Sequence, residues 1–172
     1  MVTAMARNGV DFGIRVSGLG DWWFTSPAPV VDDLYFPGYG ITDAAADLGD
    51  STITETAGLG GFAMAAAPAI VKFVNDTLGD ALPYTEEMGH MTTGRSSSFT
   101  LPILNFAGTP TEFDLCLALD NNIFPVINTG IAHKETGIGQ VGAGVTRAPI
   151  ACFAQSTTAL AEQLAESGND ND

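Results

Sequence analysis

The sequence predicts a single α/β or α+β domain in which a mixed sheet is flanked by helices. Short stretches with the period-two alternation of strands occur along the chain together with stretches that carry the apolar stripe of a helix. The chain has 172 residues, of which 45% are hydrophobic, so it can bury one sizeable core. No repeat of fixed period is present, and the strand order stays open.

The first strand signal lies at residues 9–17, where Val10, Phe12, Ile14 and Val16 alternate with mostly polar positions. Arg15 is therefore expected on the face opposite these apolar residues. Residues 18–47 are rich in Gly, Pro and Asp and also carry several aromatic side chains. We expect this stretch to be an ordered connection with packed aromatic residues.

The middle of the chain begins with β-branched residues at 51–56, which predict a strand. A glycine turn at 58–61 and a buried, Ala-rich helix should follow, and Pro68 either starts a second helix or kinks the first. Beyond it we expect a short helix at 83–90, a polar loop at 95–98, a strand at 99–106, and a helix at 112–119 that Thr111 caps.

The last third of the chain should contain two strands, at 123–128 and 140–147, joined by a polar loop. A final helix should start after Pro149. Its predicted apolar stripe consists of Ile150, Phe153, Leu160 and Leu164. We expect the domain to span residues 1–166 and residues 167–172 to form a disordered acidic tail.

The charge of the chain is strongly acidic, with 20 Asp and Glu, 6 Lys and Arg, and a net charge of -14. Nucleic acids and anionic membranes repel such a chain, so we expect neither as a partner. This balance is typical of a protein adapted to a high-salt, halophilic cytoplasm. No signal-peptide pattern follows Met1, which predicts a cytoplasmic protein. Cys116 and Cys152 lack the spacing of a zinc or disulfide framework, so we expect buried reduced thiols, no metal and no cofactor.

Two glycine-rich loops carry the candidate chemistry, and the first follows Glu55 and Thr56. Gly60 and Gly61 lie where a helix should begin, and the free N–H groups of a helix start bind anions. Glycines also let a helix approach a sheet closely, so packing is an equally open interpretation.

The second loop leaves a predicted strand at Asn128 and Thr129 and continues into His133 and Lys134. A histidine transfers protons near neutral pH, since its reference pKa is about 6.5, and a lysine binds carboxylate or phosphate oxygens. The alternative is an exposed ion pair between Lys134 and Glu135.

Among the arginines, Arg15 is preferred over Arg7 and Arg147 as an anion ligand, because it alternates away from the apolar face of its strand. A structural ion pair with one of the many acids is the alternative. The spacing GxGxxG at residues 137–142 lacks the strand before it and the helix after it that a dinucleotide site requires.

Four runs of sequence resemble a known family: RNGVDFGIRVSG, LYFPGY, GDSTITETAGLGGFAMAAAPAIV and PVINTGIAHKETGIGQVGAG. They cover most of residues 7–153 and resemble, in the same order, the C-terminal portion of the longer YlbE-like chains, also called the AllG-like family. The resemblance implies a subunit of oxamate carbamoyltransferase that works with an FdrA-like subunit and a third subunit in allantoin (purine) catabolism. The implied reaction converts oxalurate and phosphate into oxamate and carbamoyl phosphate.

That reaction implies a site for small anions such as carbamoyl phosphate, oxamate or phosphate, and it gives the candidate residues roles. Gly60 and Gly61 would hold phosphate, and Arg15 or Lys134 would neutralise it. His133 would donate or accept a proton. Asn128 and Thr129 would orient the carbamoyl group, with Glu55 as a further catalytic group and Thr56 as a further binding group.

Three functions remain open at this point. In the first, the chain is a transferase subunit that contributes active-site loops to a hetero-oligomer. In the second, it is a non-catalytic assembly or anion-binding subunit, or an inactive truncated fragment. In the third, it is a different small-anion enzyme that reuses these loops.

Overall fold

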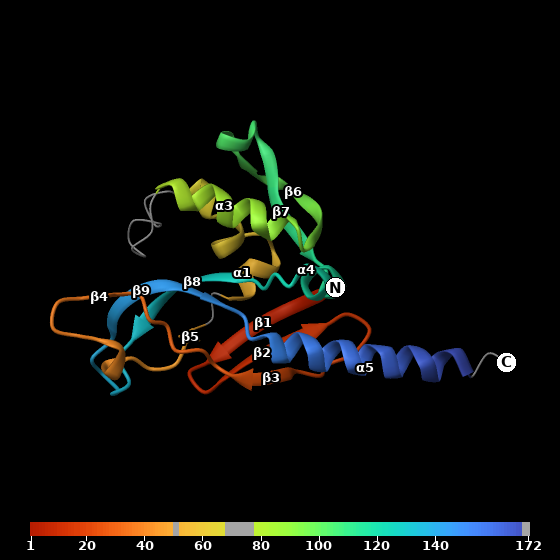
Figure 1. Ribbon diagram of the computed structural model, residues 1–172, viewed down its shortest axis with the longest axis horizontal. Coiled ribbons are helices and arrows are strands. Elements are labelled where there is room, and N and C mark those ends of the chain that lie inside the picture. Colours follow the sequence, from red (N-terminus) through yellow and green to blue (C-terminus); the bar gives the residue numbers. More distant parts are fainter. Residues whose placement is uncertain (50–51, 68–77, 170–172) are drawn as a thin grey trace.

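The strand predicted at 9–17 is present as β2 (Asp11–Val16) in the computed structural model, which describes residues 1–49, 52–67 and 78–169 (Figure 1). It belongs to a four-stranded antiparallel sheet, here called sheet A, of order β3-β2-β1-β5. The predicted apolar face is confirmed at Phe12, Ile14 and Val16, which are buried, but was wrong at Val10, which precedes the strand and is 71% exposed. The other strands of sheet A are β1 (Val2–Asn8), β3 (Phe24–Pro27) and β5 (Leu48–Gly49).

The connection between β2 and β5 is ordered, as predicted, but its aromatic residues are packed only in part. Trp22 is 73% exposed. Trp23 covers Gly13, where a Cβ would lie 3.1 Å from its ring. Tyr39 meets the ring of His133 edge-on, with centroids 5.8 Å apart. The connection also contains β3, β4 (Leu34–Tyr35) and the short 3-10 helix η1 (Ile41–Asp43).

A second antiparallel sheet, here called sheet B, has the order β4-β9-β8. The strand predicted at 140–147 is confirmed as β9 (Gln140–Arg147). The other predicted strand begins later than expected and runs further, as β8 (Val126–Ala132). Pro125 precedes it and has no N–H to donate to a ladder, which fits the later start.

A two-stranded hairpin, β6 (Thr92–Leu101) and β7 (Ala107–Phe113), replaces the predicted loop at 95–98. The predicted strand at 99–106 was correct only at its start, because the 3-10 helix η3 (Pro102–Leu104) turns the chain. Strand pairing also overrides the predicted helix start at Thr111. Helix α4 (Leu115–Asn121) is capped by Asp114, whose carboxylate accepts the N–H groups of Cys116 and Leu117, each at 2.9 Å.

The predicted strand at 51–56 was wrong, because Ile53–Thr56 forms the short helix α1. The β-branched side chains that suggested a strand bond locally instead: the Thr56 hydroxyl donates to the carbonyl of Ile53 at 2.6 Å. The glycine turn leads into the 3-10 helix η2 (Gly60–Ala66). The question about Pro68 lies outside the described residues. The helix predicted at 83–90 starts earlier, as α3 (Leu78–Gly89).

The final helix is confirmed as α5 (Ile150–Asn169). Phe153 is fully buried and Leu160 packs partly against the core, but Ile150 and Leu164 are 53% and 64% exposed. The predicted stripe therefore holds only in its central part, because the far half of α5 extends beyond sheet A (Figure 1). The helix passes through Ser167, so the part of the predicted tail that is described is helical.

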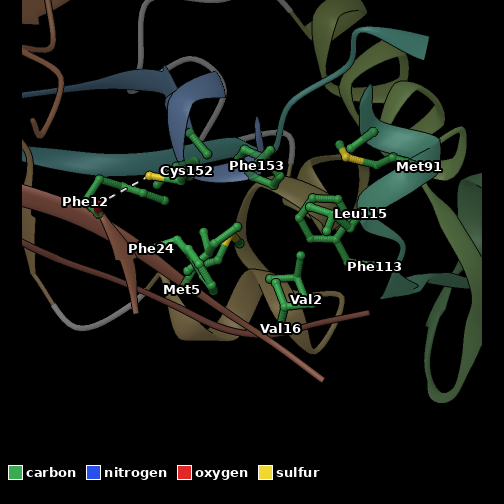
Figure 2. Close-up of a cluster of buried hydrophobic side chains, with 14 of the residues drawn as sticks. Val2, Met5, Phe12, Val16, Phe24, Met91, Phe113, Leu115, Cys152 and Phe153 are labelled. Atoms are coloured by element: carbon green, nitrogen blue, oxygen red, sulfur yellow. Dashed lines mark hydrogen bonds between the residues drawn. The ribbon is translucent and has the colours of Figure 1, made fainter. Parts of the chain in front are cut away.

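The main core lies between the inner face of sheet A, α5, and the segment that joins β7 to α4 (Figure 2). Phe113 and Phe153 meet there with ring centroids 5.7 Å apart. The Cys152 thiol is buried and donates to the carbonyl of Phe12 at 3.5 Å. The expectation of buried thiols fails for Cys116, which is exposed on α4. None of the helices in the described ranges has the length and apolar character of a membrane span.

Replacing Gly61 with Ala should strongly destabilise the fold, because a Cβ at Gly61 would overlap the carbonyl oxygen of Val126 on β8. We expect the free energy of unfolding to fall by at least about 2 kcal/mol, measured by urea denaturation. Gly40→Ala is the matched control, since a Cβ there meets no atom within 4 Å. Equal stability of the two variants would contradict the close packing of η2 on β8.

Candidate functional site

Four polar side chains from separate segments meet in the interior and form what we call the buried polar cluster: Arg7, Asp47, Glu55 and Thr129. Their exposed fractions are 6%, 3%, 2% and 4%. Charged side chains are rarely this buried unless they are paired, so the cluster is the most unusual chemical feature among the described residues.

Arg7 enters the cluster from β1, where an irregularity in the pairing with β2 between Val2 and Ala4 changes the side-chain phase. Beyond the irregularity the alternation is regular, so Met5 and Arg7, two residues apart, lie on the buried face together. Asp47 comes from the segment just before β5, which pairs with the end of β1. Gly49 lies against the guanidinium, since a Cβ there would be in van der Waals contact with Nη2 of Arg7 at 3.6 Å.

Arg7, Asp47 and Thr129 form a closed set of contacts. Nε of Arg7 lies 2.8 Å from Oδ2 of Asp47, and Nη2 of Arg7 donates to the Thr129 hydroxyl at 3.1 Å. That hydroxyl in turn donates to Oδ1 of Asp47 at 2.8 Å. Burial raises the pKa of Asp47, while the Arg7 charge and the Thr129 hydroxyl oppose the rise.

Glu55 stands beside this set on α1. Its Oε1 accepts the N–H of Gly61 at 3.1 Å, and its Oε2 accepts the hydroxyl of Thr54 at 3.3 Å. Burial raises the pKa of Glu55 to about 7, even though the Gly61 N–H and the Arg7 charge favour the carboxylate. A carboxyl group that titrates near neutral pH can act as a general acid or base.

Of the two interpretations of the first glycine loop, the structure supports packing, and the anion site stays a prediction. The N–H of Gly61 donates to a carboxyl oxygen of Glu55 in the same chain. Gly60 and Gly61 are also packing residues, since a Cβ at either position would overlap Glu55 or the Val126 backbone. Thr56 turns its hydroxyl to the carbonyl of Ile53.

The second loop forms a separate group at the end of β8. The Nδ1 atom of His133 accepts the N–H of Glu135 at 2.9 Å, and the ring packs against Tyr39. Lys134 is exposed and donates through Nζ to the carbonyl of Thr42 at 2.5 Å. Within the described part of the chain Lys134 forms no ion pair, so the ion pair with Glu135 is not present.

The remaining candidates lie apart from both groups or at their edge. Arg15 is in an ion pair with Asp21, donates to the carbonyl of Gly20, and stacks 5.9 Å from the centroid of Trp23. The structural ion pair is thus the interpretation that the geometry supports for Arg15. Asn128 is half-buried beside Thr129 and directs its amide toward the sulfur of Met64 at 3.8 Å.

The sequence interpretation missed Arg7 and Asp47 as members of a site. The signal for Arg7 was its position two residues after Met5, which places both on one face of a strand. Asp47 had no comparable signal, because its position depends on a tertiary contact. Across the described ranges, no three His, Cys, Asp or Glu side chains converge to hold a metal ion.

Comparison with known proteins shows which sequences this chain resembles. Residues 1–51 match the family model described as oxamate carbamoyltransferase subunit AllG. The AllG subunit of Escherichia coli (strain K12) is 48% identical over 165 residues, which is 95% of this chain. This chain resembles the AllG-like family along nearly its whole length. The uncharacterised protein YahG of the same organism is also 48% identical, over 163 residues and 95% of this chain.

The fold of this chain has a solved counterpart in the crystal structure of a conserved protein of unknown function from Enterococcus faecalis V583. That structure matches 94% of this chain with a TM-score of 0.91 and 53% sequence identity. This chain spans 39% of the Enterococcus protein, 39% of E. coli AllG and 34% of YahG. The shared region therefore includes the buried polar cluster and the His133 loop, within proteins that are considerably longer.

The raised pKa of Glu55 predicts a pH-dependent stability. Glu55 holds its proton more tightly in the folded state, so its favourable contribution is complete below its ordinary pKa of 4.5 and is lost as the pH rises through about 7. From about pH 4 to about pH 8, wild type should lose roughly 3 kcal/mol of unfolding free energy relative to Glu55→Gln.

Urea denaturation of both proteins across this range measures the difference. Comparison with Glu55→Gln removes the contribution of the other acids, because both proteins share them. A stability difference that does not change with pH would show that Glu55 titrates like an exposed glutamate.

Proposed function

We propose that this chain acts as part of an oxamate carbamoyltransferase, which transfers a carbamoyl group between oxalurate and phosphate in allantoin (purine) catabolism in the cytoplasm. The observation that carries the proposal is the 48% identity to the AllG subunit across 95% of this chain. In this proposal the chain works in a hetero-oligomer with an FdrA-like subunit, and its substrates are small anions. These include phosphate, oxamate and carbamoyl phosphate.

The reaction places definite demands on the protein. An oxygen of phosphate attacks the ureido carbonyl carbon of oxalurate, and the bond from that carbon to the oxamate nitrogen breaks. The nitrogen must receive a proton as it leaves, and the negative charge on the carbonyl oxygen must be stabilised in the transition state. The site therefore needs one proton donor and several N–H donors or cations.

His133 is the proton donor that the geometry supports. Because Nδ1 accepts the N–H of Glu135, the neutral ring carries its proton on Nε2 and can donate from that atom. Lys134 follows directly, and the Thr42 carbonyl holds its ammonium group while two further N–H donors remain for a substrate oxygen. Placement on a loop at the end of a strand suits contact with a substrate.

The other assignments are part of the same proposal. A phosphate at Gly60 and Gly61 would take the place of the Glu55 carboxylate, which marks where an anionic oxygen fits. Glu55 would then be free to exchange its proton near neutral pH. The carbamoyl group would be oriented by Thr56 on α1 and by Asn128 and Thr129 on β8. Arg15 would have to leave its ion pair with Asp21 to bind an anion.

A non-catalytic role as an assembly subunit is the second candidate, and one observation favours it. Arg7, Asp47 and Thr129 contact one another inside the fold, as structural groups do. Such a subunit would assemble with its partners but bind neither phosphate nor oxamate.

The proposal predicts that the assembled complex loses carbamoyl transfer when His133 is replaced with Ala. The chain is co-expressed with the FdrA-like subunit and the remaining subunit, and the complex is assayed for oxalurate formed from carbamoyl phosphate and oxamate. We expect kcat to fall roughly 100-fold, the contribution of one general acid. His90→Ala is the matched control, because His90 is exposed on the turn after α3.

An active complex in which both histidine variants keep full turnover would remove His133 from the reaction. An assembled complex that neither turns over nor binds phosphate would favour the assembly role.

A further inference from the structure

The end of the β6–β7 hairpin exposes three large apolar side chains, Phe99, Ile103 and Phe106. Their exposed fractions are 46%, 62% and 68%. We call these residues the hairpin end. Single exposed apolar residues are ordinary, whereas a group of them on one short segment is a feature of interaction sites. The hairpin end lies at the opposite side of the molecule from sheet A and α5 (Figure 1).

The hairpin end is also uncharged, although the chain as a whole carries a net charge of -14. No Asp, Glu, Lys or Arg occurs from Ser96 to Thr111. Exposed surface in so acidic a protein ordinarily carries carboxylates, which keep it soluble. Here the charges stop where the apolar side chains begin.

The backbone holds this arrangement at a cost. Asn105 and Phe106 both have left-handed backbone angles, with φ of 52° and 60°. The Phe106 N–H donates to the carbonyl of Leu101 at 2.9 Å and fixes the turn. A bulky residue in this conformation loses about 1 kcal/mol or more, and the Phe106 side chain gains little burial within the chain in return. A contact with another molecule would supply that burial.

We propose that the hairpin end is the contact surface between two copies of this chain. A partner of opposite charge would gain most from docking on the acidic faces, where Coulomb attraction assists association. A second copy carries the same charge of -14, so it can approach closely only where carboxylates are absent. An uncharged, apolar surface is therefore what a like-charged partner requires, and two-fold pairs are the commonest assemblies of identical chains.

The hollow beside α5 is lined in part by acidic side chains, so we do not expect it to be the dimer contact. Its volume is about 340 Å³, and its lining includes Leu19, Trp22 and Phe24 together with Glu162 and Glu166. The carboxylates at its rim would repel a second acidic copy. The dimer contact at the hairpin end is independent of the proposed carbamoyl transfer.

Sedimentation equilibrium of the purified 172-residue chain, from about 1 µM to about 0.5 mM, tests the proposal. We expect a reversible monomer–dimer equilibrium. Ile103→Asp and Phe106→Asp should each weaken the dimer at least about 10-fold, since each places a carboxylate in the centre of the contact. Leu164→Asp is the matched control, because Leu164 is 64% exposed on α5 and should leave the dimer within about 2-fold of wild type.

Salt provides a second readout. Raising KCl from about 0.1 M to about 1 M should strengthen the dimer, because salt screens the repulsion between the acidic chains and leaves apolar burial intact. A chain that stays monomeric at the highest concentration would overturn the proposal. A dimer that dissociates with Leu164→Asp but persists with Ile103→Asp and Phe106→Asp would also overturn it. Circular dichroism of each variant confirms that the exposed substitutions leave the fold intact.

Discussion

A single buried guanidinium joins sheet A to sheet B. Arg7 comes from β1 of sheet A, Thr129 from β8 of sheet B, and Asp47 from the segment between the sheets. The contacts among them are 2.8 to 3.1 Å long and lie almost entirely out of water. Removing charges from water is costly, so each member of the set needs the others to stay where it is. The rest of the fold is arranged around that requirement.

This constraint also positions the two groups with candidate chemistry. Thr129 lies in the middle of β8, and His133 follows four residues later, where the strand gives way to its loop. Fixing Thr129 against Arg7 therefore fixes where the His133 loop begins. On the other side, the Arg7 charge acts on Glu55, which the Gly61 N–H holds at the start of η2. One arginine thus acts on the charge of Glu55 and also contacts the strand that leads to His133.

Much of the fold could be read from periodicity, and the candidate site could be read only in part. The alternation around Phe12 and the glycine-rich strand at 140–147 were sufficient to locate β2 and β9. The stretch at 51–56 misled, because its threonines favour a strand but bond locally in a helix. The β6–β7 hairpin was missed because long-range pairing, which no local pattern shows, decides its register.

For the site, residue type located Glu55, Thr129 and His133. The spacing of Met5 and Arg7 places both on one face of a strand, but it does not decide that Arg7 rather than Arg15 is the buried cation. That choice depends on which face of β1 is buried in the fold. It also depends on Asp47, which reaches the cluster only through the tertiary fold.

The claim that Arg7 and Asp47 jointly hold the sheets together is tested most directly by a double-mutant cycle of Arg7→Met and Asp47→Asn. Urea unfolding gives the free energy for each variant. Each single substitution should cost about 3 to 5 kcal/mol, because it leaves the partner charge buried without compensation. The double variant should be more stable than the sum predicts by at least about 2 kcal/mol. Single effects that add within about 0.5 kcal/mol would contradict the account, since they would show that the two charges act independently.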